Sequence, residues 1–268
     1  MAKDYKLYIC GGFVRDSLLG IKSKDIDFAF EFSEEFISEY KDTETPEWFY
    51  DVMNKILKQQ GYSVFQETKS CFTTRAQFPT DHENAGLVAD FVLCRKETYL
   101  DENSRTPTVE MGNIYDDLSR RDATLNAIAI DESGRYLDPH NGIQDLFKGV
   151  LRCPISPGVS FSDDPLRILR FLRFSITKGF TIDDQVYHVI CNNASIWDKF
   201  DRVVSKERVY NELFSMFRHD TVKTLALIEK LKKDARFDIM RSILPEGMWL
   251  KPTFEKKKEN KMSKLNRK

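Results

Sequence analysis

The sequence lacks long hydrophobic runs, since no stretch approaches the roughly 18 apolar residues that a membrane-spanning helix needs. Its opening segment, MAKDYKLYIC, is too highly charged for a secretory signal peptide. The five cysteines lie far apart and form no C-x-x-C pair, which argues against a zinc ribbon, a thioredoxin-like motif and a disulfide scaffold. We therefore predict a cytoplasmic protein with reduced thiols and no membrane contact.

An excess of either charge sign is also missing, because 41 Lys and Arg residues nearly balance 42 Asp and Glu residues among 268. With 41% hydrophobic and 31% charged residues, the composition is that of a folded globular protein and excludes disorder and collagen-like repeats. The exception is the basic tail, residues 251–268, where eight basic side chains accompany two acidic ones. This tail is either a solvated, frayed terminus or a source of phosphate contacts with a nucleic acid.

Residues 1–150 alternate between strand-like and helix-like patterns, and the segment after Gly158 is almost entirely helix-like. We expect strands at Lys6–Cys10, Asp25–Phe32, Tyr62–Glu67, Cys71–Phe78 and Leu87–Arg95. We expect helices at Phe13–Leu19, Pro46–Gln60, Pro165–Lys178, Asp183–Asn192, Ser205–Arg218 and Thr221–Lys232, and a helix that gives way to a strand within Leu118–Ile130. The predicted fold class is α+β, with a head over residues 1–150, a helical neck over 151–218, and a short helical body with the basic tail over 219–268.

Two carboxylates lie two residues apart in the predicted strand Asp25–Phe32. Because alternate residues of a strand point to the same face, Asp25 and Asp27 project together and repel each other. A divalent cation relieves this repulsion, and Mg²⁺ prefers carboxylate oxygens. Asp90 interrupts an otherwise apolar strand, where it either faces solvent at an edge or joins the pair. Three such carboxylates would frame a two-metal centre that activates a hydroxyl and stabilises a leaving phosphate.

A glycine pair, Gly11-Gly12, follows the first predicted strand and opens the first predicted helix. Because glycine has no side chain, backbone N–H groups at this turn can approach a phosphate closely. The alternative is a plain tight turn, which also uses a glycine pair. Arg15, in the first turn of that helix, is placed to clamp the same anion. The spacing fits neither a P-loop nor a dinucleotide-binding fingerprint.

A polar cluster follows at Arg120-Arg121-Asp122 and Asn126. Asp122 and Asn126 are four residues apart, and we expect them to share a helix face. The cluster is either a surface lattice of ion pairs or a set of donors and acceptors that grips a triphosphate and a ribose.

Three arginines recur at every third residue of the helix predicted after Pro165. Arg167, Arg170 and Arg173 fall within an arc of about 120° on one helix face. Asp164 is expected to cap this helix, and it also brings carboxylate acceptors within one turn of the Arg167 guanidinium. Such a pair offers the hydrogen-bond acceptors and donors needed to recognise the edge of a base. Capping alone leaves the three aligned arginines unexplained.

In this order and spacing, the motifs resemble the class II tRNA nucleotidyltransferase (CCA-adding enzyme) and bacterial poly(A) polymerase family. The likeness covers roughly residues 7–180 and is carried by Gly11-Gly12-Phe13-Val14-Arg15-Asp16, Asp25-Ile26-Asp27-Phe28, Asp90-Phe91, Arg120-Arg121-Asp122 through Asn126-Ala127, and Asp164-Pro165-Leu166-Arg167. The resemblance implies a polymerase-β-type nucleotidyltransferase head with a mixed sheet, followed by an all-helical neck and a short truncated body.

The resemblance also implies roles for the clusters. Asp25 and Asp27 correspond to residues that hold Mg²⁺, and Asp90 completes the catalytic site. The residues implied to bind the nucleotide are Gly11, Gly12, Arg15, Arg121, Asp122, Asn126, Asp164, Arg167, Arg170 and Arg173. Among these, Asp164 and Arg167 correspond to a protein template for the incoming base.

The implied activity is a template-independent, Mg²⁺-dependent transfer of CMP and AMP from CTP and ATP to the tRNA 3′ end, complete or partial. A poly(A) polymerase that adds AMP to RNA 3′ ends shares these motifs and stays an alternative. The alternative outside the enzymes is a catalytically inactive RNA-binding module that keeps the fold, and the intact Asp25, Asp27, Arg121 and Arg167 speak against it. The sequence does not indicate an oligomeric state.

Overall fold

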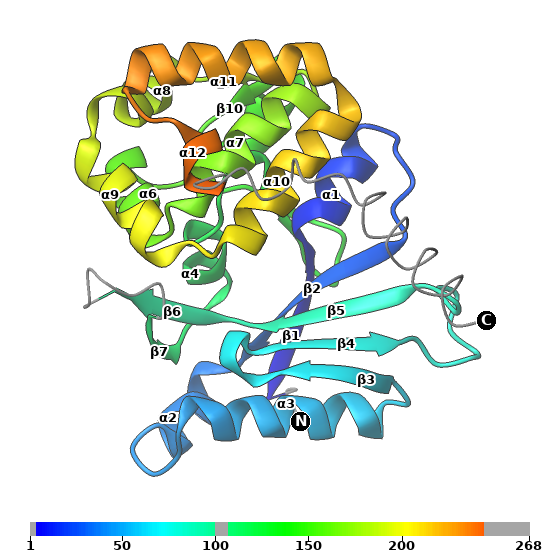
Figure 1. Ribbon diagram of the computed structural model, residues 1–268. Helices are drawn as coiled ribbons and strands as arrows, with labels where there is room; N and C mark the ends of the chain where they lie inside the picture. Colours follow the sequence, from blue (N-terminus) through cyan, green and yellow to red (C-terminus); the bar gives the residue numbers. More distant parts are fainter. Residues whose placement is uncertain (1–3, 100–106, 244–268) are drawn as a thin grey trace, which may run out of the picture.

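The computed structural model describes residues 4–99 and 107–243, which form a sheet with two helices beneath it and a helical lobe above it (Figure 1). The strands are β1 (Tyr5–Cys10), β2 (Asp25–Phe32), β3 (Ser63–Thr68), β4 (Thr73–Gln77), β5 (Val88–Leu93), β6 (Arg95–Thr98), β7 (Thr108–Met111), β8 (Ala129–Ile130), β9 (Tyr136–Leu137), β10 (Val150–Leu151) and β11 (Thr181–Ile182). The α-helices are α1 (Gly11–Leu18), α2 (Glu34–Tyr40), α3 (Pro46–Gln59), α4 (Ile114–Ser119), α5 (Gly142–Lys148), α6 (Pro157–Asp163), α7 (Leu166–Thr177), α8 (Asp184–Asn192), α9 (Ala194–Val203), α10 (Lys206–His219), α11 (Thr221–Ala235) and α12 (Ile239–Ile243). Two short 3-10 helices are η1 (Lys69–Cys71) and η2 (Thr124–Asn126). Among the described residues, no helix combines the length and the apolar character needed to cross a membrane.

Seven strands form one mixed sheet in the order β3-β4-β5-β2-β1-β8-β9, as the predicted fold class requires. Neighbouring strands are antiparallel except β2 and β5, which run parallel. The register pairs Asp27 with Asp90 across β2 and β5, and Asp90 with Arg75 across β5 and β4. Because paired residues of neighbouring strands point to the same face, these three side chains form a row across the sheet.

Strand β2 has one apolar face and one acidic face, because its apolar and acidic residues alternate along the chain. Ile26 and Phe30 are buried on the apolar face, in the same core as Met53 and Leu57 of α3. Helix α3 begins as the sequence predicts, with Pro46 in its first turn and a capping side chain that accepts the Trp48 N–H. The acidic residues of β2 are thereby directed to the face opposite α3.

The helical lobe is built around α7, which buries Leu169, Phe171 and Leu172 in its core. Side chains of α10 and α11 belong to the same core, and so do Ala123 and Leu125, which come from the segment between α4 and β8. The lobe is therefore joined to the sheet at the segment that carries the Arg120–Asn126 cluster. The boundaries near residues 150 and 218 stay predictions, and the basic tail lies outside the described residues.

Several short elements are not predicted from the sequence, among them α2, α5, α6, α9, α12 and the β6–β7 hairpin. Such segments carry a weak local signal, and tertiary contacts decide their structure. The prediction of a helix through Asn126 is wrong, because α4 ends at Ser119 and the chain turns before η2. The Thr124 N–H donates to the Arg152 carbonyl at 2.8 Å and is therefore lost to a continuing helix.

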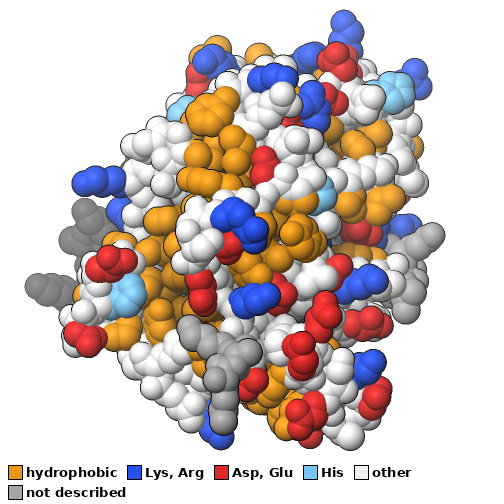
Figure 2. Space-filling model, turned by 180° about the vertical axis from the view of Figure 1, so that it is seen from behind, with side chains coloured by type: hydrophobic (Ala, Val, Ile, Leu, Met, Phe, Trp, Pro, Cys, Tyr) orange, Lys and Arg blue, Asp and Glu red, His pale blue; other side chains and the backbone are white. Residues whose placement is uncertain are grey.

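The face of the molecule opposite to the view of Figure 1 carries hydrophobic side chains in a band (Figure 2). Basic and acidic side chains border this band, and the acidic ones are most frequent at the lower right of the view. The arginines of the sequence motifs, in contrast, are largely buried or half-buried, including Arg15 and Arg167. These arginines therefore lie in an internal site and not on the open surface.

Candidate functional site

A cavity of about 550 Å³ opens where the sheet meets the helical lobe. Most of the residues singled out in the sequence line it, from α1, β2, β5, the turn after α4, and α7: Gly11, Gly12, Arg15, Asp27, Asp90, Arg121, Asp122, Asn126, Asp164, Arg167 and Arg170. Asp25 and Arg173 are not among its lining residues. A second cavity, of about 980 Å³, shares Arg120, Asp164, Arg167 and Arg208 with the first, so the two spaces adjoin.

The Gly11-Gly12 turn lies directly against the Asp27 carboxylate. Gly11 has a φ of +70°, and a Cβ at this position would stand 2.7 Å from Arg121 Nη1 and 3.2 Å from Asp27 Oδ2. A Cβ at Gly12 would stand 3.3 Å from the same Asp27 oxygen. Glycine is therefore required at Gly11 by its backbone conformation, and at both positions a side chain would crowd the Asp27 carboxylate. The turn holds backbone N–H groups, a carboxylate and a guanidinium within one small volume.

The Asp27 carboxylate is half-buried and accepts the Phe13 N–H at 3.3 Å. Burial raises the pKa of Asp27, while the nearby Arg121 guanidinium and the backbone N–H groups of the glycine turn oppose the shift. Because burial disfavours the charged form of Asp27, a bound cation would stabilise this carboxylate.

Asp25 and Asp90 face a basic side chain that the sequence reasoning missed. Arg75 of β4 donates through Nε to Asp90 Oδ1 at 2.7 Å, and its Nη2 lies 3.6 Å from Asp25 Oδ2. Within residues 4–99 and 107–243, no three or more His, Cys, Asp or Glu side chains gather as a metal-ligand group. The donor set nevertheless suits Mg²⁺, which proteins usually hold by one or two carboxylates, with water and substrate phosphates in the other positions.

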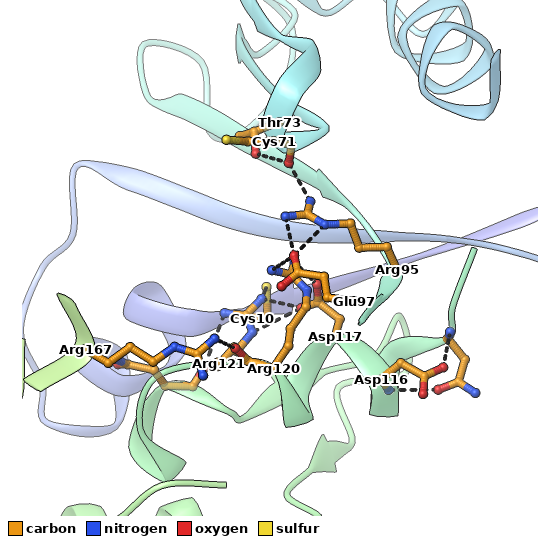
Figure 3. Close-up of polar contacts among 12 residues, drawn as sticks. Cys10, Cys71, Thr73, Arg95, Glu97, Asp116, Asp117, Arg120, Arg121 and Arg167 are labelled. Atoms are coloured by element: carbon orange, nitrogen blue, oxygen red, sulfur yellow. Dashed lines mark hydrogen bonds and ion pairs between the residues drawn. The ribbon is translucent and has the colours of Figure 1, made fainter. Parts of the chain in front are cut away.

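A buried carboxylate, Asp117, fixes the two arginines of the Arg120-Arg121 pair (Figure 3). Arg121 donates to Asp117 Oδ2 through Nε at 3.1 Å and through Nη2 at 2.8 Å, and Arg120 donates to Asp117 Oδ1. Burial alone would raise the pKa of Asp117, but the two guanidinium groups hold it at about 2. The sequence did contain a signal, because an acid three and four residues before two arginines is a helical ion-pair spacing.

Glu97 links Arg120 to the rest of this network, and Figure 3 shows the chain of contacts. Its carboxylate lies 3.4 Å from Arg120 Nη1 and 2.7 Å from Arg95 Nη2, and it accepts the Tyr99 hydroxyl at 2.8 Å. The Arg120 carbonyl in turn accepts Arg167 Nη2 at 2.6 Å. Glu97 lies in a stretch, Arg95-Lys96-Glu97-Thr98-Tyr99, that resembles the family in sequence, but no role was predicted for it from the sequence.

Asp122 and Asn126 do meet, but across a turn and not on a shared helix face. Asn126 Nδ2 donates to Asp122 Oδ1 at 2.8 Å, and Asn126 Oδ1 accepts Arg15 Nη1 at 2.6 Å. Arg170 Nε donates to Asp122 Oδ2 at 2.7 Å. Burial would raise the pKa of Asp122, but the Arg170 and Asn126 contacts hold it well below its ordinary value. Residues from α1, the turn and α7 thus form one hydrogen-bonded unit.

The Asp164 side chain caps the start of helix α7, as predicted. Asp164 has an extended backbone and its Oδ1 accepts the Leu166 N–H at 3.0 Å, while Pro165 between them already has helical backbone angles. Arg167 is buried and donates through Nη1 to the Ser160 hydroxyl at 2.9 Å. Both side chains border the two cavities, so a ligand that fills either one meets them.

Arg173 is part of a contact between α7 and α10. Its guanidinium pairs with Glu212 of α10 and lies over the Phe174 ring, 4.4 Å from the ring centroid. Arg170 links this contact to the cavity, because it pairs with Asp122 and its Nη1 also lies 3.9 Å from Glu212 Oε1.

The fold and the site together are those of a nucleotidyltransferase head, and comparison with known proteins gives the family. Residues 7–152 match the family model described as "Poly A polymerase head domain", which is more than half of the chain. The chain belongs to this family.

Curated relatives and solved structures agree with this assignment. The chain is 35% identical over 80% of its length to the tRNA nucleotidyltransferase cca2 of Schizosaccharomyces pombe, and 38% identical over 77% to the mitochondrial CCA tRNA nucleotidyltransferase of Saccharomyces cerevisiae. A crystal structure of a tRNA nucleotidyltransferase with a primer tRNA and an incoming ATP analog superimposes with a TM-score of 0.64 at 26% identity, covering 91% of this chain and 60% of that one.

The matches cover only part of the relatives. The chain spans 44% of the S. pombe relative and 37% of the S. cerevisiae relative, so less than half of each. Because one of these relatives is named as mitochondrial, the cytoplasmic location stays a prediction.

Proposed function

We propose that this chain transfers CMP and AMP from CTP and ATP to the 3′ end of tRNA in an Mg²⁺-dependent reaction. The observation that carries the proposal is the single cavity in which the Gly11-Gly12 turn, acidic side chains and buried arginines meet. The relatives named tRNA nucleotidyltransferase, and the related structure with a primer tRNA and an ATP analog, support these substrate classes.

In the proposed reaction, the RNA 3′-hydroxyl attacks the α-phosphate of the nucleotide and pyrophosphate leaves in line. A Mg²⁺ ion held by Asp25 and Asp27, with Asp90 as the third carboxylate, would supply hydroxyl activation and neutralisation of phosphate charge. The N–H groups at the start of α1 and the Arg15 guanidinium bind the triphosphate.

Arg121 contributes a fixed positive charge, since Asp117 holds its guanidinium in place before any ligand arrives. Such a preorganised donor stabilises developing negative charge without reorganisation during the reaction. Asp122 and Asn126 orient the ribose from the other side of the turn.

Base selection falls to Asp164 and Arg167, which border both cavities. A carboxylate and a guanidinium side by side present acceptors and donors to a base edge, and these differ between cytosine and adenine. Arg170 supports the pair through Asp122, and Arg173 supports it by fixing α7 against α10. The basic tail, outside the described residues, is proposed to add phosphate contacts with the RNA.

The test is incubation of the protein with tRNA that lacks its terminal CCA, together with CTP, ATP and Mg²⁺. We expect ordered addition of C residues and a final A, complete or partial, resolved on a sequencing gel. Absence of any incorporation would leave an RNA-binding module without catalysis and would refute the enzyme proposal.

The second candidate is a poly(A) polymerase, which the description of the matching family model favours. In that case ATP alone yields long A tails on RNA and CTP adds nothing. Reactions with each nucleotide separately therefore distinguish the two activities.

A further inference from the structure

Arg75 occupies the space between two of the carboxylates assigned to the metal. It is the cross-strand partner of Asp90, which is itself paired in register with Asp27. Its guanidinium contacts Asp90 Oδ1 at 2.7 Å and reaches within 3.6 Å of Asp25 Oδ2. A single side chain thus neutralises part of the charge that the carboxylates concentrate on this face of the sheet.

The third carboxylate is turned to a different partner. Asp27 Oδ2 accepts the Phe13 N–H at 3.3 Å and lies against the glycine turn. Within the described parts of the chain, no three acidic groups gather as ligands. For Asp25, Asp27 and Asp90 to act on one cation, Arg75 has to release at least one of them.

The exposure of Arg75 makes such a release feasible. Its side chain is 37% exposed, whereas that of Arg121, which pairs with the fully buried Asp117, is 16% exposed. Exposed ion pairs are weak and exchange readily, while buried ones are costly to break. Arg75 is therefore better able than Arg121 to move aside.

We propose that Arg75 is a built-in counter-ion that competes with the divalent cation for Asp25 and Asp90. The inference rests on the proposed function, since that function supplies the cation. With Arg75 in place, the carboxylates carry less repulsion and the empty site is stabilised. A divalent cation offers twice the charge of the guanidinium and displaces it, so Arg75 weakens metal binding and raises the cation concentration at which the site fills.

The experiment measures binding of Mn²⁺ alone to the full chain without nucleotide, by titration calorimetry. We expect R75Q to bind Mn²⁺ about fivefold more tightly than the natural chain, the scale of one to two exposed ion pairs. R75K, which keeps the charge, should stay within about twofold of the natural chain. The matched control is K58Q, which removes an exposed basic residue paired with Glu67 at 2.8 Å, on the β3 side of the same sheet.

Unchanged Mn²⁺ affinity in R75Q would overturn the inference, as would an equal gain in K58Q, because the effect would then be one of net charge. A D27N variant reports on the site itself. If D27N lowers Mn²⁺ affinity and R75Q does not raise it, the metal site stands and Arg75 is only a cross-strand pair. If D27N leaves Mn²⁺ affinity unchanged, the metal assignment of the proposed function fails, and this inference fails with it.

Discussion

Replacement of Asp117 by asparagine tests the electrostatic organisation of the site most directly. The side chain is fully buried and receives ion pairs from Arg120 and Arg121. Asparagine has nearly the same shape and keeps one acceptor oxygen, so packing is preserved while the charge is removed. The two guanidinium groups then lose their common counter-ion in a buried setting.

The size of the effect follows from the pKa of Asp117, which the two arginines lower from its ordinary 3.8 to about 2 despite burial. At ~1.36 kcal/mol per pKa unit, a lowering of this size corresponds to about 2–3 kcal/mol in the free energy of unfolding at neutral pH. Removing one partner of a buried ion pair costs about 3–5 kcal/mol in other proteins, and the retained amide oxygen reduces this cost for D117N. We therefore expect D117N to lose about 2–3 kcal/mol of stability.

The assay is urea denaturation of both chains at several pH values. Because the pKa of Asp117 is lowered on folding, its contribution is complete above the unfolded value near 3.8 and is lost as the pH falls through about 2. The stability difference between the natural chain and D117N should accordingly shrink below pH 4.

The matched control is D116N, because Asp116 lies apart from the arginines in Figure 3 and its side chain accepts the Asn113 N–H at 3.0 Å. This variant should lose no more than about 1 kcal/mol, the scale of a helix cap. Equal stability of D117N and the natural chain, or a difference that does not depend on pH, would refute the reasoning.

Three further substitutions examine individual residues. D27A should abolish nucleotide transfer while leaving NTP binding by filter assay largely intact, and lost binding with residual turnover would contradict the metal role. R167A should relax or lose the choice among the four NTPs in single-nucleotide incorporation, and unchanged selectivity would place base reading elsewhere. G11A should lower the free energy of unfolding by about 1–3 kcal/mol, because a Cβ would strain the backbone and meet Arg121 Nη1 at 2.7 Å. G134A is the control, because Gly134 has a φ of +81° and an added Cβ would meet no atom within 4 Å, so this variant measures the cost of backbone strain alone. An equal loss of stability in G11A and G134A would show that the contact with Arg121 contributes nothing.

Elements with a strong local signal were predictable from the sequence. Strand β2 begins and ends at Asp25 and Phe32 as expected, because its apolar residues alternate without interruption. Helix α3 matches within one residue, since Pro46 marks its start and its apolar face repeats at helical spacing. These signals act within a few residues and need no tertiary contact.

Features that depend on tertiary contacts were not predictable. The Arg120–Asn126 segment has a helical pattern, but α4 ends at Ser119 and the Thr124 N–H donates to the Arg152 carbonyl, far along the chain. Arg75 reaches Asp90 only because β4 and β5 pair in one particular register, which the composition of either strand leaves open. The residue types in the sequence were enough to find the clusters of the site. The side chains that pair with them, such as Arg75, could be identified only from the folded structure.

The site thus contains arginines of two kinds, and the difference between them is testable. Arg120 and Arg121 are fixed by a carboxylate that is itself buried, so their charge is in position before a nucleotide binds. Arg75 is held by half-exposed carboxylates and is free to exchange them for a cation. Substitution in the first group should therefore change stability and nucleotide binding together. Substitution of Arg75 should change metal affinity with little effect on nucleotide binding, because its partners are those assigned to the cation.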